Sequence, residues 1–241
     1  RISINDTIKE NNLIIHVGNG RILDPFARFH ARVDLEKRRM TAANHSATHL
    51  IHYALRKVLG THVEQKGSLV TADKLRFDFS HFTRPTREEL IRVEMMVNKI
   101  IRENVNRRVI EGLTMDQAKE MGAIALFGEK YGDTVRVVTF GDSVELCGGT
   151  HIENTGSIGI LKIISEGAIA AGIRRIEAVT ALRAEEYINE KLGNAEEAAA
   201  LLKITGDLKE GVSKLIDENI TLKKSLEKYR AQMALVKVTE L

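Results

Sequence analysis

Cysteine is almost absent from this chain, whose 241 residues include only Cys147. A single cysteine excludes an internal disulfide and is typical of a protein that works in a reducing, cytosolic compartment. The sequence also has no stretch approaching the roughly 18 uninterrupted apolar residues that a membrane-spanning helix needs. We therefore expect a cytoplasmic globular protein that does not insert into a membrane.

The first ten residues, RISINDTIKE, lack both an initiator methionine and the basic-then-apolar pattern of a signal peptide. We therefore expect a piece of a longer protein. The net charge of +3 is compatible with a polyanionic partner such as a nucleic acid. Many enzymes with neutral substrates carry a similar charge, so composition by itself identifies no function.

The chain divides into three zones, which together predict an α+β fold. Residues 1–40 contain short strand-like runs at 13–17 and in a segment ending at 31–35, with a turn expected at 18–20, and suggest the end of a β-barrel-like domain. Residues 41–183 alternate helices and strands, and residues 184–241 are helical. Breaks between the last helices are expected at Gly193 and Gly206.

Local patterns place several elements in the middle zone. Thr41 is a candidate N-cap for a helix that ends at Gly60, and capping boxes are expected at Thr86–Glu89 and Thr114–Gln117. Alternation of apolar and polar residues predicts a half-buried strand at 75–80. Further strands are expected at 134–140, 159–164 and 174–180.

The last zone carries a heptad-like seam that steps by four and three residues. Its members are Leu208, Val212, Leu215, Asn219, Leu222, Leu226, Tyr229, Met233 and Val236. Such a seam is typical of a coiled coil, in which one polar member such as Asn219 fixes the register. The pattern leaves open whether the helix self-associates or folds back on the helix at 194–204.

Two short motifs supply possible metal ligands. His45 and His49 are four residues apart on a predicted helix, so their side chains share one face. Cys147 and His151 enclose two glycines and a threonine in a loop after a predicted strand. One cysteine and three histidines form a ligand set that favours zinc. His52 and His81 are rival histidines that spacing alone does not exclude.

The two motifs belong to a series of six distinctive segments. They are NHSATHL at 44–50, VEQKGSLV at 63–70, LRFDFSH at 75–81, ALFGEKYG at 125–132, ELCGGTH at 145–151 and GIRRIEAVT at 172–180. In this order and spacing, the series resembles the editing domain of alanyl-tRNA synthetases, from about residue 32 to residue 180. The helical zone then corresponds to the start of the C-terminal helical region. The related threonyl-tRNA synthetase editing domain has a different segment in place of CGGTH.

The resemblance implies a function and a set of site residues. It implies zinc held by His45, His49, Cys147 and His151, which makes Cys147 part of the catalytic centre and sets His52 aside. It further implies that Thr48 and Gln65 line the aminoacyl pocket, and that Arg174 and Arg175 lie in a segment that holds tRNA. The expected reaction is hydrolysis of serine or glycine mischarged onto alanine tRNA, whose acceptor end is then the partner.

The chemistry of such a site can be anticipated from its ligands. Zinc either activates a bound water or orients the aminoacyl group, although four protein ligands fill a tetrahedral ion as in structural sites. We expect one loose ligand or a five-coordinate ion. The backbone N–H groups of Gly148 and Gly149 either face the ester oxyanion or only form a turn. Thr48 either meets the substrate hydroxyl or bonds its own backbone.

Nucleic-acid contacts are less well defined by the sequence. Arg174 and Arg175 alternate on a predicted strand and point to opposite faces, so at most one contacts tRNA directly and the other pairs with a carboxylate. The pairs at 107–108 and 38–39 are further candidates for phosphate contacts. No ATP-binding motif is present, so ATP is expected only for an aminoacylation domain that this chain lacks.

Two other functions remain open from the sequence. One is a free-standing trans-editing deacylase that removes amino acids from alanine tRNA. The other is a non-catalytic RNA-binding module that zinc only stabilises.

Overall fold

The computed structural model describes the chain except residues 1, 12, 23, 25, 126–131 and 240–241, and it describes only the backbone of residues 234–239. Most of the segment at 125–132 therefore lies outside the described residues. The chain forms two units, Arg1–Leu35 and Glu36–Leu241. Within the described residues, no helix combines the length and apolar content that crossing a membrane requires.

The first unit is built on an antiparallel hairpin of β1 (Ser3–Glu10) and β2 (Leu13–Asn19). The turn expected at 18–20 is wrong, because Gly18 and Asn19 pair with Ile4 and Ser3 inside the ladder. A Cβ on Gly18 would lie 2.4 Å from the Ser3 carbonyl oxygen, so the glycine allows the two strands to approach each other here. The expected strand-like segment at 31–35 is also wrong, since residues 31–34 form neither strand nor helix and a helix begins at Leu35.

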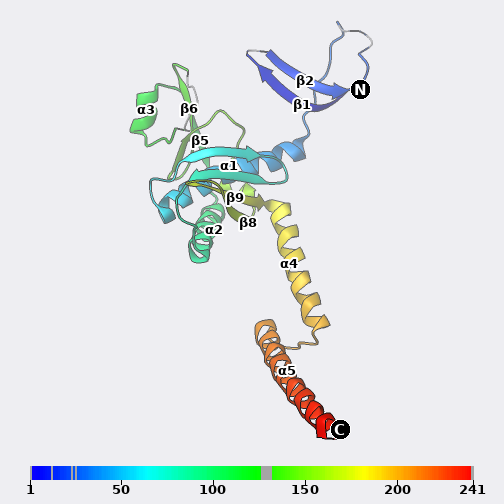
Figure 1. The fold of residues 1–241 in the computed structure, drawn as a ribbon. Helices are drawn as coiled ribbons and strands as arrows, with labels where there is room; N and C mark the ends of the chain where they lie inside the picture. Colours follow the sequence, from blue (N-terminus) through cyan, green and yellow to red (C-terminus); the bar gives the residue numbers. More distant parts are fainter. Residues whose placement is uncertain (1, 12, 23, 25, 126–131, 240–241) are drawn as a thin grey trace. The chain divides into compact units, whose positions relative to one another are not determined.

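The second unit contains two antiparallel sheets and confirms the α+β class (Figure 1). The four-stranded sheet has the order β3 (Gln65–Val70), β4 (Leu75–Ser80), β9 (Ile173–Thr180) and β8 (Leu161–Ala170). The three-stranded sheet has the order β5 (Arg107–Leu113), β6 (Val135–Phe140) and β7 (Ser143–Leu146). The helices of this region are α1 (Leu35–Leu59), α2 (Arg87–Arg102), α3 (Met115–Glu120) and the 3-10 turn η1 (Thr155–Ile158).

Helix α1 is central to the core and longer than expected. Thr41 is not its N-cap: the helix begins six residues earlier, and the Thr41 hydroxyl donates a hydrogen bond to the Lys37 carbonyl. Its buried residues Leu50 and Ile51 belong to one apolar cluster with Phe77 of β4 and Val138 of β6. The helix therefore joins strands of both sheets through a single core, which fixes the position of its histidines.

Several local predictions for this region are confirmed. Both capping boxes form, at Thr86–Glu89 for α2 and at Thr114–Gln117 for α3. Leu75, Phe77 and Phe79 are fully buried, as their alternation in β4 predicts. The last expected strand agrees with β9, whereas the strand expected at 159–164 begins later, at Leu161, because η1 precedes it.

The C-terminal zone consists of α4 (Ala181–Leu201) and α5 (Leu208–Thr239). The break expected at Gly193 is wrong, since this residue lies inside α4; the expected break at Gly206 lies between the two helices. Leu215, Leu222, Leu226, Tyr229 and Met233 of the α5 seam are exposed. The side chain of Val236 lies outside the described residues, and self-association through the seam stays a prediction.

Candidate metal centre

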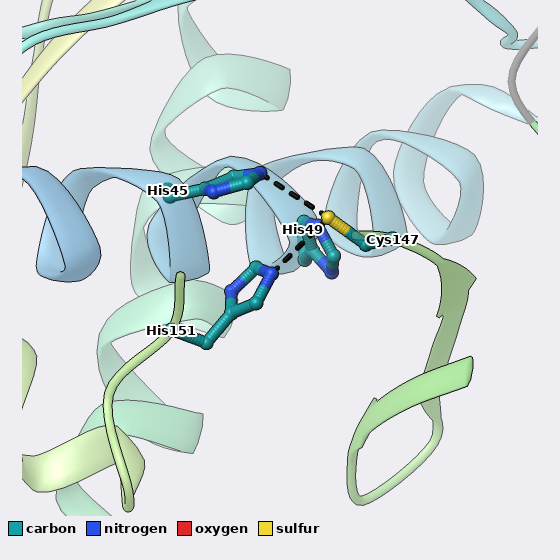
Figure 2. Close-up of side chains that lie close together, drawn as sticks. All are labelled: His45, His49, Cys147 and His151. Atoms are coloured by element: carbon teal, nitrogen blue, oxygen red, sulfur yellow. Dashed lines mark hydrogen bonds between the residues drawn. The ribbon is translucent and has the colours of Figure 1, made fainter. Parts of the chain in front are cut away.

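Helix α1 presents two candidate ligands, His45 and His49, one turn apart (Figure 2). The surrounding helix is rich in alanines with little or no exposure, such as Ala42 and Ala47, which allow close packing around the histidines. His49 is 4% exposed, and His45 is half-buried. The local i, i+4 rule therefore places two imidazoles on one face of a buried helix.

The loop after β7 brings Cys147 and His151 to the same face of α1, as Figure 2 shows. The Cys147 Sγ atom lies 3.4 Å from His45 Nε2 and 3.2 Å from His151 Nε2. One possible ligand atom from each of the four residues lies within 4.8 Å of the others. The structure therefore gathers all four side chains that the sequence singled out as ligands.

The spacing of these atoms suits a tetrahedral zinc ion. Zinc bonds of about 2.0–2.3 Å to nitrogen and sulfur imply ligand-to-ligand distances of about 3.3–3.6 Å. The two measured distances to Cys147 Sγ, 3.4 and 3.2 Å, are close to this range. Thiolate sulfur and imidazole nitrogen are both zinc ligands, so the four residues fit the ion in chemistry, and the two distances to Sγ are compatible with it.

Hydrogen bonds from residues outside the cluster orient two of the imidazole rings. Nδ1 of His151 lies 3.1 Å from Ser46 Oγ, and the Ser46 hydroxyl donates its proton to the Ala42 carbonyl. Since that proton is used, Ser46 accepts from His151 Nδ1–H, which leaves the Nε2 lone pair for a metal. His45 makes a hydrogen bond to the Thr150 backbone. Such outer contacts fix the tautomer of a ligating histidine.

The third ring faces a buried carboxylate. Nδ1 of His49 lies 3.4 Å from Glu145 Oε2 but is not aligned for a hydrogen bond. The other Glu145 oxygen lies 2.7 Å from Nδ1 of His52. His52, a rival ligand in the sequence, therefore contacts Glu145 and is not one of the four clustered residues. The other rival, His81, contacts His62 and Thr83 instead.

Burial keeps the clustered imidazoles in their neutral, metal-binding form. It lowers the pKa of His45 to about 4, with a further contribution from His49. It lowers the pKa of His151 to about 2, and His49 and His45 add to the effect. Burial acts to raise the pKa of Glu145, but His49 and the hydrogen bond from His52 outweigh it, so this pKa is lowered. Neutral imidazoles are the form that binds a metal ion.

Two arginines hold the ligand loop from the side of the three-stranded sheet. Arg136 Nη1 donates to the carbonyl oxygens of Cys147, at 2.7 Å, and Gly149, at 3.1 Å. Arg107 Nη1 donates to the His151 carbonyl at 2.8 Å. These contacts fix the backbone at both ends of the loop. Arg107, a candidate for phosphate contact in the sequence, is thus used inside the protein.

The two loop glycines have different surroundings. The Gly149 N–H donates to Cys147 Sγ at 3.4 Å, so in this structure it contacts the thiol. Gly148 is exposed, and a Cβ built on it would meet nothing within 4 Å. Cys147 and His45 are half-buried, whereas His49 and His151 are 4% and 5% exposed. Among the described residues, Cys147 and His45 are therefore the more accessible members of the cluster.

The two expected pocket residues lie on different elements. Thr48 is 3% exposed on α1, and its hydroxyl donates to the Asn44 carbonyl at 2.9 Å. This is the local backbone bond that the sequence offered as the alternative to substrate contact. Gln65 begins β3 and donates to Ser68 Oγ at 3.2 Å. Neither bond uses all the hydrogen-bonding capacity of the side chain.

Both expected tRNA-binding arginines make ion pairs inside the protein. Arg175 forms a two-pronged pair with Asp78, at 2.7 and 2.8 Å, on the neighbouring strand β4. Arg174 pairs with Glu166 of β8. The Arg175 side chain is 32% exposed and that of Arg174 is 11% exposed. Alternation on β9 does turn them to opposite faces, and Arg175 is the more accessible.

Sequence reasoning assigned no role to Glu145, Ser46 or Arg136. An acidic residue between Val144 and Leu146 of a short strand was the available indication for Glu145. Ser46 and Arg136 gave no comparable indication: the Ser46 hydroxyl reaches His151, 105 positions away, and Arg136 reaches the ligand loop across the β6–β7 hairpin.

Comparison with known proteins matches the part of the chain that contains the ligand loop to a known family. Residues 135–177, which include Cys147 and His151, match the family model described as the threonyl and alanyl tRNA synthetase second additional domain. The matched segment runs from β6 into β9, so it contains the ligand loop and Arg174–Arg175 but not the two histidines of α1.

Whole-chain relatives extend the match to α1. The chain is 55% identical over 228 residues to the alanine–tRNA ligase of Bacteroides fragilis, covering 95% of this chain and 26% of that protein. It is 52% identical to the ligase of Bacteroides thetaiotaomicron, with the same coverage of 95% and 26%. It is 49% identical to that of Cytophaga hutchinsonii, covering 96% of this chain and 27% of the relative. The chain is thus homologous over nearly its whole length to a segment of alanine–tRNA ligases, and it spans about a quarter of the length of the relatives it matches.

Proposed function

We propose that this chain is the editing portion of an alanyl-tRNA synthetase, and that it hydrolyses the ester of serine or glycine mischarged onto alanine tRNA. The observation that carries the proposal is the cluster of His45, His49, Cys147 and His151, of which His45 and Cys147 are only half-buried. Similarity to alanine–tRNA ligases suggests the substrate class. The proposed cofactor is zinc, and the proposed partner is the acceptor end of the tRNA.

A second hydrolytic site has a physical reason in an alanine enzyme. A pocket sized for a methyl group cannot exclude glycine and rejects the extra hydroxyl of serine poorly. Discrimination by one small group is limited to about 1–3 kcal/mol. Hydrolysis at a separate site, where the wrong amino acid is bound as an ester, supplies the remaining accuracy.

Each candidate residue has a definite role in the proposal. The four clustered side chains hold zinc, which when bound supplies a Lewis acid for a carbonyl oxygen or for water. Thr48 has acceptor capacity left for a serine hydroxyl, and Gln65 has a free amide oxygen for the substrate amine. Of the two loop glycines, Gly148 is the candidate N–H donor to the ester oxyanion, because Gly149 donates to Cys147.

Contact with tRNA is proposed through Arg175 rather than Arg174. The partial exposure of Arg175 allows its guanidinium to contact a phosphate while it remains paired with Asp78. Arg174 is more deeply buried against Glu166 and serves the fold. A cytoplasmic setting is part of the same proposal, since Cys147 must stay reduced to bind a metal.

A deacylation assay combined with metal analysis tests the function. The purified chain is expected to contain one zinc ion and to hydrolyse Ser-tRNA(Ala) and Gly-tRNA(Ala) but not Ala-tRNA(Ala). Cys147→Ala should lose both zinc and activity. His81→Ala, which removes a histidine outside the cluster, is the matched control and should retain both. A wild-type chain that binds no stoichiometric zinc would refute the proposal.

The alternative of a non-catalytic, zinc-stabilised RNA-binding module is favoured by one observation. Four protein ligands complete a tetrahedral zinc site, which is the usual pattern of structural zinc. Zinc removal distinguishes the two. For the editing enzyme, hydrolysis is abolished while most helicity measured by circular dichroism remains. For the structural module, the fold is lost with the metal and no deacylation is detected at any zinc concentration.

Self-association through α5 and action in trans are further proposals. The exposed seam residues from Leu215 to Met233 suit a second copy of the helix. Sedimentation equilibrium of the wild type and Leu222→Glu tests this, and a monomer in both would refute it. Deacylation by the isolated chain added to an editing-deficient synthetase tests activity in trans.

A further inference from the structure

A carboxylate lies in the protein interior directly beside the proposed metal ligands. The Glu145 side chain is 3% exposed, although it lies in a short strand between Val144 and Leu146. Burying an ionised carboxylate is costly unless positive charge or hydrogen bonds compensate for it. Glu145 therefore needs partners, and its surroundings identify them.

Two histidines of α1 face the two oxygens of this carboxylate. His52 Nδ1 lies 2.7 Å from Oε1, and His49 Nδ1 lies 3.4 Å from Oε2. Nδ1 of His49 has no hydrogen bond within the described part of the chain, and Oε2 of Glu145 is the carboxylate oxygen that lies beside it. That arrangement leaves Nε2 of His49 for the metal.

A second anion would balance the charges of the site. A divalent cation bound by three neutral imidazoles and one thiolate leaves a net charge of +1. The ligand His49 is 4% exposed and His151 is 5% exposed, so water screens this charge poorly. The Glu145 carboxylate brings the sum to zero without entering the cluster of four ligands.

From these contacts we propose that Glu145 is a positioning residue for the metal site: it orients His49 through Nδ1 and supplies the second negative charge, while His52 holds it in place. The inference rests on the proposed zinc site and adds a residue that contacts a ligand without binding the metal itself. Residues that orient a ligating histidine in this way contribute about 10- to 100-fold to metal affinity.

The first test compares two Glu→Gln variants of the full chain. Glu145→Gln keeps the size of the side chain but removes its charge and half of its acceptor capacity. Glu153→Gln removes an exposed carboxylate two residues after His151 and serves as the control. Zinc affinity measured by chelator competition should fall about 10- to 100-fold for Glu145→Gln and stay within about twofold for the control. Equal affinity in all three chains would overturn the proposal.

A second pair of variants acts through His52, in case Glu145→Gln does not fold. His52→Asn retains an amide N–H close to the position of Nδ1, whereas His52→Leu retains the bulk and removes the donor. Zinc affinity should be close to that of the wild type for His52→Asn and about tenfold weaker for His52→Leu. If both variants bind zinc equally, His52 does not hold Glu145 for the metal, and the proposal fails.

Cobalt(II) substitution separates orientation of a ligand from general stability. In Glu145→Gln the thiolate-to-cobalt charge-transfer band should persist, because Cys147 is unchanged, while the ligand-field bands shift as His49 reorients. Unchanged ligand-field bands with unchanged affinity would overturn the positioning role alone. A wild-type chain that binds neither cobalt nor zinc would refute the metal site itself, and with it the proposed function.

Discussion

Gly149 lies against His45: a Cβ built on the glycine would be 2.1 Å from Cε1 and 2.7 Å from Nδ1 of the imidazole. The glycine is therefore needed for steric reasons, because any side chain would displace the His45 ring. Gly148, the preceding residue, has open space at the same position. The two glycines of the CGGTH loop thus form a natural pair for substitution.

Gly149→Ala is expected to displace His45 from the cluster and to weaken zinc binding at least tenfold, on the scale of losing the orientation of one ligand. Gly148→Ala should leave zinc affinity within about twofold, because its methyl group meets no atom. Chelator competition on both variants provides the measurement. Equal zinc affinities for the two would show that His45 is free to move and that its contact with Gly149 is unimportant.

Arg136 is expected to stabilise the ligand loop through its two bonds to carbonyl oxygens. Arg136→Lys cannot reproduce both bonds, and should lower the free energy of unfolding of the metal-free chain by about 2 kcal/mol. Urea titration followed by circular dichroism measures the change. Arg108→Lys, at an exposed neighbouring strand position, should be neutral. A neutral result for Arg136→Lys would mean that the loop keeps its conformation without it.

Thr48→Val removes a hydroxyl that is positioned beside the ligands on α1. If Thr48 meets the substrate serine, the ratio of kcat/KM for Ser-tRNA to that for Gly-tRNA should fall about two- to tenfold, the value of one neutral hydrogen bond. Glycine has no hydroxyl and provides the internal control. An unchanged ratio would leave Thr48 with only its bond to the Asn44 carbonyl.

Arg175→Ala is expected to weaken tRNA binding and to reduce the slope of log affinity against log salt by about 0.7–0.9. Arg174→Ala should instead lower the free energy of unfolding by about 3 kcal/mol, because it leaves the buried Glu166 without its close partner. Arg84→Ala, which removes an 83% exposed arginine 3.8 Å from the same carboxylate, should be nearly neutral. The reverse pattern for the two strand arginines would reassign the tRNA contact to Arg174.

The metal-free chain should lose stability as the pH falls from about 6.5 to 4. The pKa of His45 is about 4 in the folded protein and near 6.5 in the unfolded chain, so the unfolded state binds more protons in this window. This loss of stability is absent above pH 6.5. Below it, His45 lowers the free energy of unfolding by at most about 1.4 kcal/mol per pH unit. His45→Gln should show a shallower dependence in denaturant titrations with chelator present. An equal slope in both chains would contradict the lowered pKa.

Short-range patterns correctly placed much of the fold. The capping boxes at Thr86 and Thr114 and the alternation around Phe77 depend on residues within four positions of one another, so local sequence encodes them. Other predictions failed because a residue expected to begin or end an element lies inside an element that continues past it. Gly18 belongs to a ladder with Ile4, Gly193 lies inside α4, and α1 continues past Thr41 toward its N-terminus.

The same division applies to the metal centre. The spacing of His45 and His49, and of Cys147 and His151, made them candidate ligands, because each pair is fixed by one helical turn or one short loop. The resemblance to the editing domain then set His52 aside. Only tertiary structure brought the pairs together and surrounded them with Glu145, Ser46 and Arg136. The contacts His52–Glu145 and Ser46–His151 join residues 93 and 105 positions apart, a separation at which no periodicity of the sequence indicates a neighbour. Which atom each imidazole turns toward a metal is decided by those distant partners.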